Sequence, residues 1–364
     1  MSPPSAGART LPLEIYLLVF AHLSPQDQLS FLRALPQIAP LVSPMHVTSR
    51  DANGDTILHF LARDGRDEAA LFNDLVSSHP PAVLHLQNNS GVTPLMYTAA
   101  NWNYSLLRIL LEKDPAGLNI SDDNGSTALF YALDSDFDDG VDLLLAQPSI
   151  DVNCTRGSRY PETPLLRAID MGSCDVAKAL IRHPSIDVNW KSEHVNPALV
   201  KAISQFEREL AEFMILNRPD LDVNAAVDGG LSALDTAILL DESLVYRLLL
   251  EQDSIDADRP GSVGKTPLAQ AVLGCNIEAM ELLLARSDVD VNRVDNRGRS
   301  ALSYAVEISA ADYVRLLLEH GARPDLEDHE GRTPISRAAA QPPAFKHILA
   351  LLEAVKDVET SVVT

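Results

Sequence analysis

Short apolar runs recur along the chain, and most of them begin just after a threonine or serine. Clear examples are "VTPLMYTA" from Val92, "STALFYAL" from Ser126, "ETPLLRAI" from Glu162 and "RTPISRAA" from Arg332. The hydroxyl position, or the residue in its place, falls at 56, 93, 127, 163, 197, 232, 266, 300 and 333, at intervals of 33 to 37 residues. A period of this length in nine copies is typical of a solenoid of stacked units.

Each copy predicts two helices and a turn. The threonine or serine caps the first helix, and a proline often takes the first helical position, where its missing N–H costs nothing. A second helix follows with a leucine block, such as Leu282-Leu283-Leu284. An extended segment like "DVDVN" and a glycine turn like "DNRG" complete the unit. Because one unit cannot bury its leucines alone, the pattern predicts an all-α repeat solenoid.

The copies resemble the ankyrin repeat, whose Gly-x-Thr-Pro-Leu-His and Ala-Asp-Val-Asn patterns they follow over residues 49–353. We expect a disordered tail over 1–10 and a C-terminal tail over 354–364. In the fifth copy Pro197 replaces the threonine and the turn glycine is absent, so an irregular finger is expected there. The resemblance implies a protein-binding function.

Gly264-Lys265-Thr266 also matches the last three residues of a nucleotide-binding P-loop. That motif needs a glycine five residues before Gly264, where Arg259 stands, and Pro260 removes a backbone donor. The repeat phase instead makes these residues a turn followed by a helix cap.

Residues 11–45 lie outside the repeat phase. A helix is expected after Pro12 and a second from about Gln26 to Pro36, with a break at Ser24-Pro25. The segment resembles an F-box, which implies docking on the Skp adaptor of a cullin–RING ubiquitin ligase. The adaptor-docking residues by this resemblance are Leu11, Pro12, Ile15, Val19, Phe20 and Leu23. The alternative is a helical cap over the first repeat, which solenoid ends require.

Charge narrows the classes of partner. The chain has 51 acidic and 29 basic residues and a net charge of −22. Residues 1–48 carry two charges of each sign, so the excess lies in the rest of the chain. An acidic body disfavours nucleic acid and membrane surfaces as partners. Cys154, Cys174 and Cys275 have no paired spacing, which fits a reducing compartment and predicts a cytoplasmic or nuclear location.

The sequence predicts no enzyme active site, metal site or cofactor. The histidines have no metal-binding spacing, and the "DSDFDDG" stretch, residues 134–140, lacks the glycine and glutamate of a calcium loop. That acidic stretch is expected to be a turn between helices.

The expected partner-binding groove combines two sets of residues. The position four after each threonine should face the groove, and tyrosine and arginine are enriched there, as in interface hot spots. Finger residues in the middle of the array add a basic and aromatic patch, which we expect to anchor an acidic or phosphorylated side chain. The candidates are Tyr97, Tyr131, Arg156, Arg159, Tyr160, Arg167, Trp190 and Lys201.

These patterns predict a protein–protein interaction adaptor. The specific hypothesis is a substrate receptor of a cullin–RING ligase, with the N-terminal segment on the Skp adaptor and a target protein on the repeats. One alternative is an ankyrin scaffold with no link to ubiquitin. Another is a nucleotide-dependent enzyme that uses Gly264 to Thr266.

Overall fold

The computed structural model of the 364-residue chain describes residues 12–64, 66, 68–77, 79–340 and 345–362. It forms two compact units, Met1–Ile186 and Asp187–Thr364, and each is described by itself. Within the described residues the regular structure is helical, and the two isolated β-bridges, Arg156–Glu162 and Val294–Ser300, lie in turns. The predicted all-α repeat fold is confirmed.

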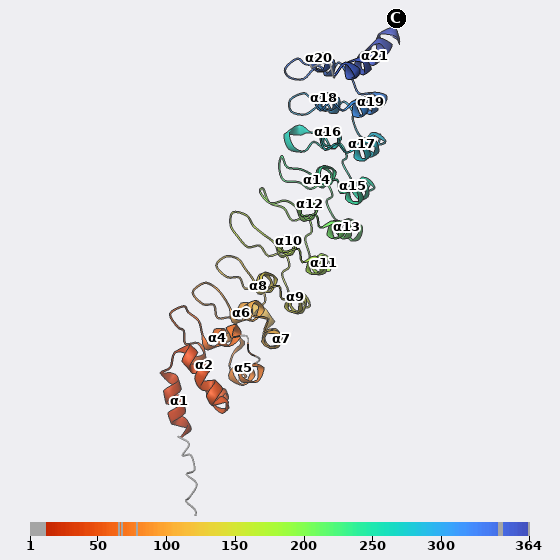
Figure 1. The fold of residues 1–364 in the computed structure, drawn as a ribbon. Coiled ribbons are helices and arrows are strands. Elements are labelled where there is room, and N and C mark those ends of the chain that lie inside the picture. Colours follow the sequence, from red (N-terminus) through yellow and green to blue (C-terminus); the bar gives the residue numbers. More distant parts are fainter. Residues whose placement is uncertain (1–11, 65, 67, 78, 341–344, 363–364) are drawn as a thin grey trace, which may run out of the picture. The chain divides into compact units, whose positions relative to one another are not determined.

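The first unit begins with four short helices (Figure 1). They are α1 (Leu13–Ala21), α2 (Pro25–Ala34), the 3₁₀ helix η1 (Pro36–Leu41) and α3 (Pro44–Val47). The hydroxyl oxygen of Ser24 accepts the N–H of Asp27 at the start of α2, with Pro25 in the first turn. The two helices and the break expected at Ser24-Pro25 are therefore confirmed, while residues 1–10 lie outside the described part of the chain.

Paired helices make up the rest of the first unit. The first helices of the pairs pack on one another in chain order, and so do the second helices. The first helices are α4 (Ile57–Arg63), α6 (Pro94–Ala100), α8 (Ala128–Asp134) and α10 (Pro164–Asp170). The second helices are α5 (Ala69–Val76), α7 (Tyr104–Lys113), α9 (Asp138–Leu145) and α11 (Cys174–Arg182). The short helices η2 (Pro81–His85) and η3 (Pro115–Gly117) lie between pairs.

The second unit repeats the same arrangement. Its first helices are α12 (Ala198–Ser204), α14 (Ala233–Leu239), α16 (Pro267–Leu273), α18 (Ala301–Glu307) and α20 (Pro334–Ala339). Its second helices are α13 (Arg208–Asn217), α15 (Ser243–Leu250), α17 (Ile277–Leu284), α19 (Ala311–Glu319) and α21 (Lys346–Val362), and η4 (Ser262–Gly264) lies in a turn. Helix α21 continues beyond residue 353, where the repeats were expected to end.

Hydroxyl caps start most of the first helices, as predicted. The Oγ1 atoms of Thr93, Thr163 and Thr266 accept the N–H of the residue three positions on, at 3.2 to 3.4 Å. In the first repeat the cap is reinforced by His59, whose Nδ1 accepts the Thr56 N–H while Nε2 donates to the Val92 carbonyl of the next repeat. Helix α12 forms after Pro197 without a side-chain cap.

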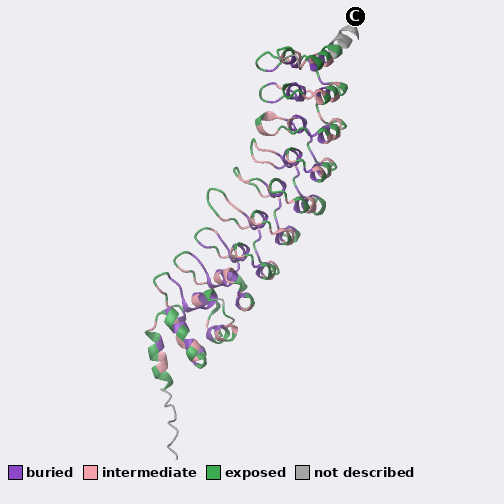
Figure 2. Ribbon diagram, in the orientation of Figure 1, coloured by how far each residue is buried: buried purple, intermediate pink, exposed green. Residues whose placement is uncertain are grey.

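Apolar side chains from both helices of each pair, leucines in most of them, form the core, and Figure 2 shows buried positions along the helices. Asparagines join several of the repeats to the next through the backbone. The Nδ2 atom of Asn224 donates to the Ser254 carbonyl at 2.7 Å, and its Oδ1 accepts the Asp256 N–H at 2.9 Å. Asn119, Asn189 and Asn292 make equivalent paired bonds. This explains why the asparagine of the "DVN" segment recurs.

Candidate functional site

Helix α1 presents an apolar surface to solvent. Leu18 is 62% exposed, and Leu13, Ile15 and Val19 are also exposed. Of the predicted docking residues, Pro12, Ile15 and Val19 are exposed, Leu23 is half-buried and Phe20 is fully buried. Leu11 lies outside the described residues. A run of exposed aliphatic side chains on one short helix is a feature of interaction surfaces.

The buried Phe20 attaches α1 to the helices that follow. Its ring packs against the rings of Phe31 and His46, and its carbonyl accepts a hydrogen bond from the buried Gln28 side chain at 3.2 Å. Phe20 is therefore a structural anchor, and only the other side of α1 is available to a partner.

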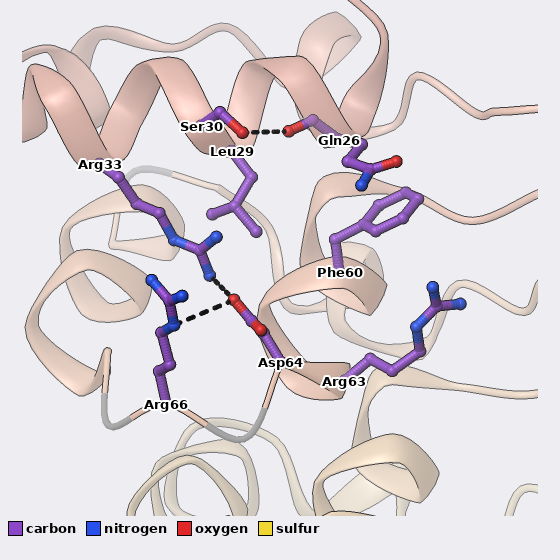
Figure 3. Close-up of a pocket in the computed structure, with 8 residues that line it drawn as sticks. All are labelled: Gln26, Leu29, Ser30, Arg33, Phe60, Arg63, Asp64 and Arg66. Carbon is purple, nitrogen blue, oxygen red and sulfur yellow. Dashed lines mark hydrogen bonds and ion pairs between the residues drawn. The ribbon is translucent and has the colours of Figure 1, made fainter.

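The first repeat is covered by α2 and η1. Leu29 and Leu32 of α2 are buried where α2 packs on α4, and η1 packs on α5. At the edge of this contact the Nε atom of Arg33 donates to Glu68 at 2.7 Å, and its guanidinium also pairs with Asp64 (Figure 3). The cap that a solenoid end requires is thus present, and the exposed face of α1 is not part of it.

The tyrosines predicted to line the groove hold the finger turns in place. The Tyr131 hydroxyl donates to Oδ2 of Asp122 at 2.9 Å, while Oδ1 of Asp122 accepts the N–H groups of Asn124 and Ser126. Burial, together with the hydrogen bond to Asp122, raises the pKa of Tyr131, so its hydroxyl remains a donor. The Tyr97 hydroxyl instead accepts a hydrogen bond from Nδ2 of Asn88, the equivalent turn residue, at 3.3 Å. Both tyrosines are half-buried rather than freely exposed.

The arginines of the predicted patch are paired within the protein. Arg156 bonds to both Asp134 and Glu162, and Arg167 donates from Nε to Asp134 at 2.7 Å. The Arg156 guanidinium also lies over the Phe130 ring, 4.5 Å from its centroid. These internal carboxylates already occupy the positions that an acidic ligand would take. The structure therefore does not support Arg156 and Arg167 as the expected anchor for an anion.

Arg159 and Tyr160 occupy the tip of the same finger. The Arg159 guanidinium lies over the Tyr160 ring at 5.5 Å, and Tyr160 is 59% exposed. Tyr160 also lines a hollow of about 510 Å³ together with Tyr131 and Arg156. Trp190 and Lys201 belong to the second unit, where both side chains are half-buried.

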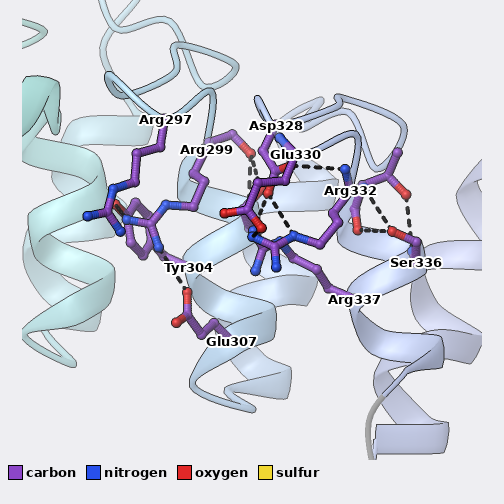
Figure 4. Close-up of polar contacts among 12 residues, drawn as sticks. Arg297, Arg299, Tyr304, Glu307, Asp328, Glu330, Arg332, Ser336 and Arg337 are labelled. Carbon is purple, nitrogen blue, oxygen red and sulfur yellow. Dashed lines mark hydrogen bonds and ion pairs between the residues drawn. The ribbon is translucent and has the colours of Figure 1, made fainter.

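The second unit contains a cationic surface that sequence reasoning missed (Figure 4). The Tyr304 ring has Arg299 at 4.4 Å and Lys265 at 5.4 Å from its centroid. Arg297 lies on the same finger turn as Arg299, and its side chain points toward Tyr304. The sequence does contain a signal for this surface. The residue just before the repeat threonine or serine is Lys265, Arg299 or Arg332 in the last three copies, and it is not basic in the other six.

Gly264, Lys265 and Thr266 take the conformation of a finger turn. Gly264 has a positive φ of +77°, a Cβ there would lie 2.8 Å from the Asn296 backbone nitrogen, and Thr266 caps α16. Within the acidic stretch 134–140, residues 135–137 form the predicted turn between helices, while Asp134 ends α8 and residues 138–140 begin α9. Among the described residues no cluster of side chains could hold a metal ion, and no helix has both the length and the apolarity to cross a bilayer.

Paired helices, capped finger turns and asparagine links between repeats define a helical repeat protein. A family model described as "Ankyrin repeats (3 copies)" matches residues 68–156 and 274–361, and one described as "Ankyrin repeat" matches 160–190. These segments span more than half of the sequence, so the chain belongs to the ankyrin-repeat proteins. Neither match covers the N-terminal helices. A search of curated proteins returned no match.

Ankyrin repeats support the role of a protein–protein interaction adaptor, and proteins of this family are typically binding scaffolds without enzymatic activity.

Proposed function

We propose that this ankyrin-repeat adaptor is the substrate receptor of a cullin–RING ubiquitin ligase. In this proposal α1 docks on the Skp adaptor and the repeats hold a target protein. The main observation in its favour is that the N-terminal helices differ in what they contact: some cover the first repeat, and one has an exposed apolar face. Helix α2 and η1 pack on the helices of the first repeat, while four aliphatic side chains of α1 stay exposed: Leu13, Ile15, Leu18 and Val19.

The energetics of burial favour a partner on α1. Exposed leucine and valine side chains gain on the order of 1.5–3 kcal/mol each when a partner buries them fully. Residues 1–48 have no net charge, in contrast to the acidic repeats, so docking here would not be opposed by a strong local field. An aliphatic helix face of this kind suits a hydrophobic groove in an adaptor protein.

The target would be held by side chains of the fingers and first helices. Among the predicted groove residues, Arg159 and Tyr160 are the most accessible pair, and Tyr97 and Tyr131 present ring edges whose positions are fixed by their hydrogen bonds to the finger turns. Trp190 and Lys201 supply a second set in the second unit. Rigid placement favours these tyrosines as contacts, because little side-chain entropy is lost on binding.

The second candidate function is an ankyrin scaffold with no link to ubiquitin. It is favoured by the cap formed by α2 and η1 and by the absence of a family match over the N-terminal helices. Under this alternative α1 is only the first part of the cap.

Direct binding to purified Skp adaptor tests the proposal. We expect the wild-type chain to bind, and the double variant Leu18→Asp/Val19→Asp to lose binding while the circular dichroism of the repeats is unchanged. The matched control is Met45→Asp, which puts a carboxylate on another exposed apolar position of the N-terminal helices, 73% exposed. Failure of the wild type to bind, or equal loss in the control, would refute the docking role and favour the scaffold.

A further inference from the structure

The last repeats of the second unit present an unusual concentration of cations. Lys265, Arg299 and Arg332 occupy the same position in three successive repeats, just before the hydroxyl cap. Their fingers are joined by backbone hydrogen bonds, from Asn296 N–H to Val263 O at 3.2 Å and from His329 N–H to Arg297 O at 2.9 Å. The three cations therefore belong to neighbouring fingers.

The cations of these fingers, with Arg297 included, differ in whether a carboxylate pairs with them. Arg299 pairs with Asp295 and Glu307, and Arg332 pairs with Asp328 and Glu330. Within the described ranges of the chain, neither Lys265 nor Arg297 forms an ion pair; Lys265 contacts the Tyr304 ring and Arg297 is exposed. In a chain of 51 acidic residues, this pair of unneutralised cations marks a surface suited to an anion.

The carboxylate of Asp295 lies beneath this surface and pairs with Arg299. Asp295 is buried, and its two oxygens accept the N–H groups of Arg297 and Arg299, the Tyr304 hydroxyl at 2.5 Å and the Arg299 side chain. Both oxygens are therefore bonded to the finger turn, to Tyr304 and to Arg299. The result is a fixed aromatic ring flanked by Lys265 and Arg299, with the Arg297 side chain directed toward it (Figure 4).

We propose that the surface formed by Lys265, Arg297 and Arg299, over the buried Tyr304 ring, binds an acidic segment of a partner protein. Glutamate or aspartate carboxylates would pair with Lys265 and Arg297, and the buried Tyr304 ring beneath them would hold Lys265 and Arg299 in place. Arginine is suited to this role because it can hold a carboxylate with two parallel hydrogen bonds. This inference requires only protein binding by the repeats and is independent of the docking role of α1.

An acidic peptide fits this surface better than a nucleic acid does. Glu307 and Glu330 lie at its edges, paired with Arg299 and Arg332. A closely spaced row of phosphates would be repelled by these two glutamates and by the chain's net charge of −22. A peptide can carry its carboxylates at intervals and avoid both glutamates.

Fluorescence anisotropy with the full chain tests the inference. The probe is a short fluorescein-labelled peptide of alternating glutamate and alanine, and the comparison peptide replaces each glutamate with glutamine. We expect the glutamate peptide to bind and the glutamine peptide not to bind. The double variant Lys265→Ala/Arg297→Ala should weaken binding by about tenfold or more, since two charge-assisted contacts are lost.

The control double variant is Arg108→Ala/Lys113→Ala, which removes the same charge from exposed positions on α7. It should keep the affinity within about twofold. Neither double variant removes a buried carboxylate partner, so unfolding midpoints should be unchanged. Equal loss of affinity in the two double variants would mean a general charge effect and would overturn the proposal. So would tighter binding of a single-stranded DNA oligonucleotide than of the glutamate peptide, or the absence of peptide binding to the wild type.

Discussion

The replacement Leu283→Ala tests whether the leucine blocks of the second helices hold the repeats together. Leu283 is 0% exposed and lies on α17, which packs on α16 of the same repeat. Truncating a buried leucine removes its burial energy and leaves a cavity, and the cost is typically about 2–5 kcal/mol. Because Leu283 is fully buried, we expect a loss of about 3 kcal/mol in the free energy of unfolding of the second unit.

Urea unfolding followed by far-ultraviolet circular dichroism measures this loss, from the shift in midpoint multiplied by the slope of the free energy with denaturant. The transition should also broaden, because coupling between adjacent repeats is weakened at one point in the array.

The matched control is Leu216→Ala on α13 of the same unit, where the leucine is 65% exposed. That change should cost less than about 0.5 kcal/mol. The reasoning is refuted if Leu283→Ala costs less than about 1 kcal/mol, or no more than Leu216→Ala does, since the leucine block would then contribute little to the core.

Two further predictions concern polar contacts in the first unit. Burial lowers the pKa of His59 below its ordinary value of 6.5. As pH falls below 6.5 the unfolded chain therefore takes up a proton before the folded chain does, and the folded state loses stability. Thermal melts of His59→Gln should lack this part of the pH dependence between about pH 5 and 7. Tyr131→Phe removes the hydroxyl that donates to Asp122 and should lower the local stability of this finger turn by about 1–2 kcal/mol. The loss should appear as faster hydrogen exchange at the Asn124 and Ser126 amides. The control Tyr104→Phe changes an exposed tyrosine and should leave exchange at those amides unchanged.

The repeat itself could be predicted from sequence because its signals are local. The cap at Thr266, the positive φ of Gly264 and the burial of Leu283 each depend on a few adjacent residues and on the repeat period. Helix α12 shows the limit of such local rules, since it forms after Pro197 without the cap because packing on α13 and α14 supplies the stability.

The contacts of the binding residues could not be predicted in the same way. The sequence indicates that Tyr131 and Arg167 follow a repeat threonine by four residues, but not that Asp122 and Asp134 lie opposite them. Those partners come from across a finger or from the preceding repeat, and their choice depends on side-chain rotamers. One recurring signal does exist, since the residue five before the threonine pairs with the residue four after it at Asn88/Tyr97, Asp122/Tyr131, Asp295/Tyr304 and Asp328/Arg337.

This pairing decides where charge can contribute to recognition. At Arg156 an incoming carboxylate would have to displace Asp134 or Glu162, so the new ion pair would replace an existing one and the net gain would be small. At Lys265 and Arg297 no ion pair has to be broken, and the cations are held beside a tyrosine whose hydroxyl is already bonded to Asp295. An acidic segment of a target therefore meets less competition at Lys265 and Arg297 than at Arg156 and Arg167.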